Sequence, residues 1–148
     1  MISTDNIYLD LELADYKSVL STVARLLRDK GYVTKEFEAA LLSREELSPT
    51  GVPASPIGVA LPHTNPQYVI KPCVIIVRLK RPVLFREMGN PSKEVEAKYI
   101  FGLAFLDGKE QAPLLSRIIS MVIDAEAMEK LEMATTSEEV YNVASAYI

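Results

Sequence analysis

Apolar residues recur at helical spacing in two segments of the first third of the chain. Between residues 15 and 30 they fall three or four positions apart, which predicts an amphipathic helix, and Gly31 supplies the residue that a left-handed C-terminal cap prefers. A second helix is expected to begin near Thr34, a possible N-cap, and to end near Glu45. Its buried side would carry Phe37, Leu41 and Leu42.

The middle of the chain has short apolar runs rich in β-branched and aromatic residues. Residues 47–56 contain three prolines and a glycine, so we expect a loop there that holds neither a regular helix nor a central strand. The run 57–61 is typical of a strand, which Pro62 should end because proline has no amide hydrogen for the ladder. Interior strands are expected at 74–79 and 99–105, with a weaker candidate at 83–85.

Helical patterns return in the last third of the chain. A wide apolar face begins near Pro113, and residues 125–133 favour a further short helix. Thr136 followed three positions later by Glu139 is a capping-box signature for a last helix. Helices before and after the strands predict an α/β fold, a three-layer α/β/α sandwich around a small mixed sheet, with residues 1–148 as a single domain.

Composition narrows the classes of function and of location. The net charge of -4 and the absence of a basic run argue against nucleic acid as a partner. The single Cys73 cannot form an internal disulfide and lies in an apolar run, so we expect a buried thiol and a reducing cytoplasm. No apolar stretch approaches the roughly 20 residues that span a bilayer, and the N-terminus does not resemble an export signal.

Several common chemistries lack their residues in this sequence. There is no glycine-rich loop followed by Lys and Ser or Thr for nucleotide phosphates, no Cys and His cluster for a metal, and no Gly-x-Ser-x-Gly elbow for a serine nucleophile. The adjacent acids Glu45-Glu46 and Glu138-Glu139 are interpreted as solvated helix ends without a catalytic role. We therefore expect neither a metal nor a cofactor.

The only histidine, His63, is the remaining candidate for chemistry. A lone histidine is more often structural or merely exposed than functional. His63, however, follows a proline at the expected end of a strand, where α/β sheets place reacting groups. A neutral imidazole with an ordinary pKa of about 6.5 is a competent nucleophile near neutral pH.

The segment Gly58-Val59-Ala60-Leu61-Pro62-His63-Thr64 resembles the active-site signature of the fructose and mannitol class of phosphotransferase-system enzyme IIA domains. The segment from Arg44 to Gly51 is similar to the Arg-Glu region upstream of that signature, and similarity extends over nearly the whole chain. The further matching segments, in family order, are Lys71-Pro72, Phe85 to Pro91, Leu103-Ala104, Asp107 to Glu110 and Ser137 to Tyr141. Within the family, the chain looks most like the standalone galactitol-type branch.

The resemblance implies a phosphocarrier in which His63 takes a phosphoryl group from phospho-HPr and passes it to an enzyme IIB, with a membrane permease involved only indirectly. Arg44 would stabilise the charge of the transferred group, and Thr64 would bond the phosphate or orient the ring; for each, a solvated side chain is the alternative. Many members carry a second histidine where this chain has Gln111, which could donate a hydrogen bond to phosphate or to His63, or be an exposed helix-start residue.

Three roles remain open at the level of sequence. Besides the carrier, a regulatory protein could use His63 phosphorylation to control binding to a partner, and a structural partner domain could keep an idle histidine. A carrier needs small, weak docking surfaces, so apolar residues such as Leu61 or Ile57 could be partly available to partners. A core position is the alternative for both residues, and we prefer it for Ile57.

Overall fold

The chain folds into five strands and five helices, which the computed structural model describes over residues 1–148. The strands are β1 (Ile7–Leu11), β2 (Gly51–Val52), β3 (Gly58–Ala60), β4 (Cys73–Glu87) and β5 (Asn90–Ala104). The helices are α1 (Tyr16–Asp29), α2 (Phe37–Leu47), α3 (Gln111–Val122), α4 (Ala125–Met133) and α5 (Ser137–Ala144). No helix is both long enough and apolar enough to span a bilayer.

A long antiparallel hairpin dominates the sheet. β4 and β5 have 15 residues each and pair along most of their length. β1 lies parallel to β4, β3 lies parallel to β5, and the two-residue β2 joins β3 to the end of β4. The sheet is therefore mixed, in the order β1-β4-β2-β3-β5, and it curls because β4 also pairs with β5.

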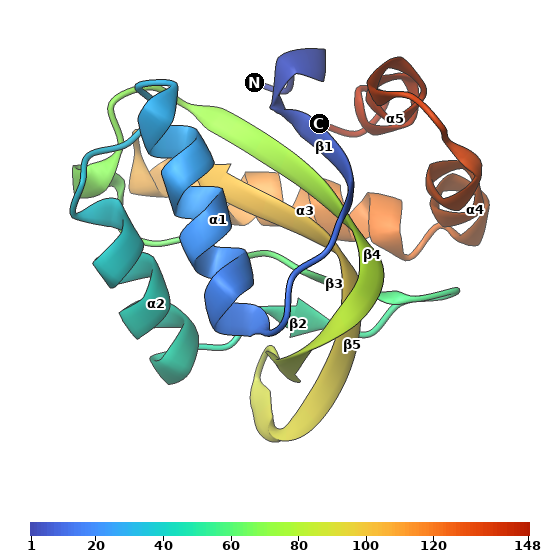
Figure 1. The fold of residues 1–148 in the computed structure, drawn as a ribbon, viewed down its shortest axis with the longest axis horizontal. Coiled ribbons are helices and arrows are strands. Elements are labelled where there is room, and N and C mark those ends of the chain that lie inside the picture. Colours follow the sequence, from blue (N-terminus) through green and yellow to red (C-terminus); the bar gives the residue numbers. More distant parts are fainter.

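Helices cover both faces of this sheet, and each face has its own apolar core. Alternate residues of β4 point to opposite sides: Val74 and Ile76 belong to one cluster, and Ile75 and Val77 belong to the other. The first cluster includes residues of α3, α4 and α5, whereas the second includes residues of α1 and α2 (Figure 1). The predicted α/β fold with helices on both sides of a mixed sheet is confirmed.

Most helices lie where the periodicity places them. Gly31 has a positive φ of 80° after α1, and α4 spans the predicted residues. The predicted start of α2 is wrong. The helix begins at Phe37 and continues to Leu47, while the side chain of Thr34 caps nothing and its Oγ1 is buried without a hydrogen-bond partner.

Each strand predicted at 57–61, 74–79, 83–85 and 99–105 is present, but other stretches of strand are not predicted. Residues 74–79 and 99–104 form the inner part of the hairpin, and the weaker candidate at 83–85 lies in the outer half of β4, whereas β1 and the rest of the outer hairpin are not predicted. The expectation that 47–56 contains no strand inside the sheet is also wrong, because β2 pairs on both sides. Gly51 permits this: a Cβ there would lie 2.6 Å from the Arg86 carbonyl oxygen.

Candidate active site

His63 lies just beyond the end of β3, as the sequence predicts. β3 ends at Ala60, and Pro62 then accepts a hydrogen bond from the amide of Leu103 at 3.0 Å. His63 itself forms an isolated parallel bridge with Leu103 of β5. The backbone that carries the histidine is thus fixed to the interior strand of the hairpin even though proline ends the regular ladder.

The His63 ring is buried and held at both nitrogens. Only 4% of the residue is exposed, and its ring centroid lies 6.0 Å from that of Phe105. Nδ1 lies 2.7 Å from the carbonyl oxygen of Leu61, and Nε2 lies 3.2 Å from the side-chain nitrogen of Gln111. Because a carbonyl oxygen only accepts, Nδ1 carries the hydrogen in the neutral ring, and the lone pair is on Nε2, where the Gln111 amide donates to it.

The surroundings of His63 favour its neutral form. Burial lowers the pKa of His63 below its ordinary value, because an imidazolium would lose hydration there. The hydrogen bond with the Leu61 carbonyl acts in the opposite direction, and the positive charge of Arg44 lowers the pKa again. The ring therefore keeps an unprotonated Nε2 at neutral pH, which a nucleophile requires.

Two further predicted site residues are Arg44, whose charge acts on His63, and Thr64, which follows His63 in the chain. Arg44 is partly buried near the end of α2, close enough for its charge to act on His63, and it is absent from the six ion pairs of the protein. Its guanidinium is thus free to meet an anion. Thr64 is 5% exposed, and the structure assigns its hydroxyl no hydrogen-bond partner.

A buried acid that the sequence interpretation placed in solvent stands beside Arg44. Glu45 is 5% exposed, and its two carboxylate oxygens accept hydrogen bonds of 2.7 Å from the amide and the hydroxyl of Thr50. Burial raises the pKa of the Glu45 carboxyl, and these hydrogen bonds lower it. The available signal was spacing: Phe37, Leu41 and Glu45 lie four residues apart and share the buried face of α2.

The apolar residues near His63 differ from expectation. Leu61 is fully buried in the core, so of its two expected positions the core position is confirmed and availability to partners is wrong. Ile57 packs against the first cluster but is only partly buried, so its preferred core position is met in part. Leu106, which follows Phe105, is 50% exposed and provides an apolar surface at this end of β5.

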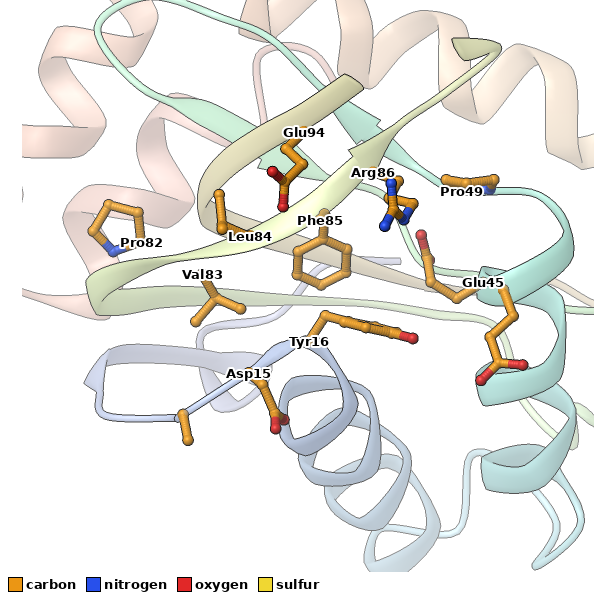
Figure 2. Close-up of a pocket in the computed structure, with 12 residues that line it drawn as sticks. Asp15, Tyr16, Glu45, Pro49, Pro82, Val83, Leu84, Phe85, Arg86 and Glu94 are labelled. Atoms are coloured by element: carbon orange, nitrogen blue, oxygen red, sulfur yellow. The ribbon is translucent and has the colours of Figure 1, made fainter. Parts of the chain in front are cut away.

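A cavity of about 520 Å³ lies apart from His63, between the start of α1, the end of α2 and the hairpin. Figure 2 shows the rings of Tyr16 and Phe85 inside it, with Pro49 and Arg86 toward one end. Glu45 belongs to its wall, but none of the four predicted site residues does. No group of three or more His, Cys, Asp or Glu side chains is arranged to hold a metal ion.

Comparison with known families agrees with this arrangement of fold and histidine. The family model described as "Phosphoenolpyruvate-dependent sugar phosphotransferase system, EIIA 2" matches residues 1–146. The chain therefore belongs to the enzyme IIA type 2 family of this phosphotransferase system. Domains of this family are phosphotransferases that act through a phosphohistidine intermediate.

The similar proteins include an enzyme IIA component and a transcriptional regulator. The mannitol-specific phosphotransferase enzyme IIA component of Bacillus subtilis is 26% identical over 143 residues, which cover 95% of this chain and 93% of that protein. The transcriptional regulator ManR of the same organism is 30% identical over 84 residues, or 57% of this chain. A solved structure from Escherichia coli contains mannitol enzyme IIA in a complex with phosphorylated enzyme IIB, and its enzyme IIA chain has the same fold as this protein. The TM-score is 0.80, the sequences are 23% identical, and 99% of both chains is covered.

Many of the relatives are much longer than this chain. The chain spans 12% of ManR, 16% of the multiphosphoryl transfer protein of Shigella flexneri and 21% of the mannitol-specific EIICBA component of Buchnera aphidicola.

Proposed function

We propose that this chain is a cytoplasmic phosphocarrier, with residues 1–148 acting as one domain. His63 accepts a phosphoryl group from phospho-HPr and transfers it to a cognate enzyme IIB during sugar uptake. The observation that carries the proposal is the state of the His63 ring: it is buried and neutral, with Nδ1 bound to Leu61 and the lone pair on Nε2. The family membership and the mannitol enzyme IIA relative support the same reaction.

The transfer step uses the two ring nitrogens differently. The Nε2 lone pair of His63 attacks phosphorus in line, the new P–N bond forms, and the P–N bond of phospho-HPr breaks with its electron pair returning to the departing imidazole. The His63 ring gains positive charge as this bond forms. Nδ1 keeps its hydrogen, so the Leu61 carbonyl, already 2.7 Å away, stabilises the ring through a strengthened hydrogen bond.

The neighbouring side chains act on the phosphoryl group. Arg44 neutralises the negative charge that spreads over the equatorial oxygens in the transition state. Gln111 now donates to Nε2 and must leave it when phosphorus arrives, and a phosphoryl oxygen is then its nearest new acceptor. Thr64, the next residue in the chain, would supply a hydroxyl for the same oxygens or for orientation of His63.

For the transported substrate we propose galactitol or a related polyol. The sequence resemblance to the galactitol-type branch supports this choice, and the mannitol-specific relative, which the chain nearly covers, also serves a polyol. A regulatory protein whose His63 phosphorylation controls partner binding is the second candidate, favoured by the similarity to the regulator ManR.

A pulse-chase experiment separates the two candidates. The protein is phosphorylated with phosphoenolpyruvate, enzyme I and HPr, freed from the donors, and mixed with purified galactitol-type or mannitol-type enzyme IIB. Rapid loss of the label to the galactitol-type enzyme IIB alone is the expected result. A label that stays on His63 with every enzyme IIB tested would contradict the transport role and favour regulation.

A further inference from the structure

The buried carboxylate of Glu45 connects the end of α2, which carries Arg44, to the segment after that helix, which leads to His63. We infer that Glu45 is a positioning residue that holds the Arg44 end of α2 in register with the chain segment that carries His63. The inference rests on the proposed phosphocarrier function for its kinetic consequences, but its geometric content stands on the hydrogen bonds of Glu45 alone.

A continuous series of hydrogen bonds joins Glu45 to the His63 ring. The Glu45 carboxylate accepts from the amide and hydroxyl of Thr50, both at 2.7 Å. The Thr50 carbonyl accepts from the amide of Leu61 at 3.1 Å, and the Leu61 carbonyl accepts from Nδ1 of His63 at 2.7 Å. Movement of Thr50 would therefore shift Leu61 and with it the acceptor that fixes the ring.

The same carboxylate fixes the helix that carries the cation. Arg44 precedes Glu45 in the last turns of α2, about 100° away around the helix axis. No ion pair holds the guanidinium. Its place relative to His63 thus depends on how the end of α2 is held, and the two bonds between Glu45 and Thr50 tie that end to the segment leading into β2.

An acid at this position is not needed to cover the core. The preceding residues on the same helix face are Phe37 and Leu41, and an unbranched apolar side chain at 45 would continue that face. Burying a carboxylate is costly, and replacement of buried charged groups by apolar residues is often neutral or stabilising. The bonds to Thr50 therefore give Glu45 a role in fixing geometry that an apolar residue lacks.

The cavity beside Glu45 makes this role testable. Because Glu45 lines the cavity of about 520 Å³ that also contains Tyr16 and Phe85, a substituted side chain there meets open space on one side (Figure 2). A longer or more flexible replacement is accommodated without a clash. The Glu45→Met variant should therefore fold and lose mainly the link to Thr50.

The experiment compares Glu45→Met with Glu45→Gln and with the control Glu46→Gln, whose carboxylate is exposed and lies 3.9 Å from Lys17. Two kinds of measurement are made: the kinetics of phosphoryl transfer from phospho-HPr, as kcat and KM, and the tautomer of His63 by nitrogen NMR. The assignment is unambiguous because the protein has one histidine.

Glu45→Met should lower kcat at least about tenfold with KM little changed, since displacements near 1 Å cost up to about a hundredfold. It should also reduce the population of the Nδ1-protonated tautomer. Glu45→Gln should recover most of both, because its amide oxygen accepts from the Thr50 amide and its nitrogen donates to the Thr50 hydroxyl. Glu46→Gln should match wild type.

An unchanged kcat and tautomer in folded Glu45→Met would overturn the inference, as would losses in Glu46→Gln of the same size. If Glu45→Met does not fold, Thr50→Val provides the same test, because it removes one of the two donors with little change of shape. If wild type accepts no phosphoryl group, the proposed function fails, and the tautomer measurement still decides the positioning role.

Discussion

Gly58 offers a direct test of how strictly the strand before His63 must be placed. A Cβ at this position would lie 2.5 Å from Cγ1 of Val95 and 2.7 Å from the carbonyl oxygen of Glu96. The valine can rotate away, but the backbone oxygen belongs to β5 and cannot. Restoring an ordinary contact requires β3 and β5 to separate by about 0.7 Å, so Gly58→Ala strains the sheet three residues before Leu61.

The expected cost of Gly58→Ala is about 1–3 kcal/mol of unfolding free energy, the usual range for overpacking. For a chain of this length each kcal/mol lowers Tm by about 2–4 °C. A shift of this size in the strand that leads to His63 should also slow phosphoryl transfer about tenfold if it reaches the ring. Urea unfolding followed by far-UV circular dichroism measures the first effect, and single-turnover transfer from phospho-HPr measures the second.

Gly108→Ala is the matched control, because no atom lies within 4 Å of a Cβ there and its φ is not positive. It should stay within about 0.5 kcal/mol of wild type and transfer at the same rate. The reasoning is refuted if Gly58→Ala equals Gly108→Ala in both the urea midpoint and the transfer rate.

Three further predictions concern titration, a hydrogen bond and a buried cation. Because burial lowers the pKa of His63, the unfolded chain binds a proton before the folded chain does as pH falls below about 6.5. The free energy of unfolding of wild type, from urea titrations, should therefore fall with pH in that window relative to that of His63→Gln, and an equal dependence on pH in the two proteins would contradict this. Gln111→Ala should slow phosphoryl transfer about fivefold, which corresponds to one hydrogen bond of about 1 kcal/mol, and an unchanged or faster single-turnover rate would remove Gln111 from the proposed mechanism. Arg78→Met should lower the free energy of unfolding by about 3 kcal/mol in thermal unfolding, because the buried guanidinium donates to both carboxylate oxygens of Asp10 and to two carbonyls at the end of α4. The control Arg81→Ala, at an exposed side chain, should cost under about 0.5 kcal/mol, and equal losses in the two variants would contradict a stabilising role of the Arg78 hydrogen bonds.

Elements that bury a regular apolar pattern could be predicted from sequence. α1 and α4 have clear periodicity, and the inner halves of β4 and β5 are apolar on both faces because helices cover both. Of the outer hairpin only residues 83–85 could be predicted, as a weaker candidate, since exposed polar residues interrupt the pattern elsewhere. β2 has only two residues and exists because its neighbours pair with it.

Some residues of the candidate site could be predicted from the sequence, and others could not. His63 and Gln111 could be singled out by motif and by position, and the structure places them in contact. Glu45 could not, because an acid next to another acid near a helix end is usually solvated. Its burial depends on Thr50, whose amide and hydroxyl reach the carboxylate only after the loop has folded back along β3.

The central claim is that His63 accepts a phosphoryl group. Wild type and His63→Ala are incubated with phosphoenolpyruvate, enzyme I and HPr, and intact masses are recorded before and after mild acid. The account predicts that wild type alone gains one acid-labile phosphoryl group. No gain on wild type with reagents that phosphorylate another enzyme IIA, or an equal gain on His63→Ala, would contradict it.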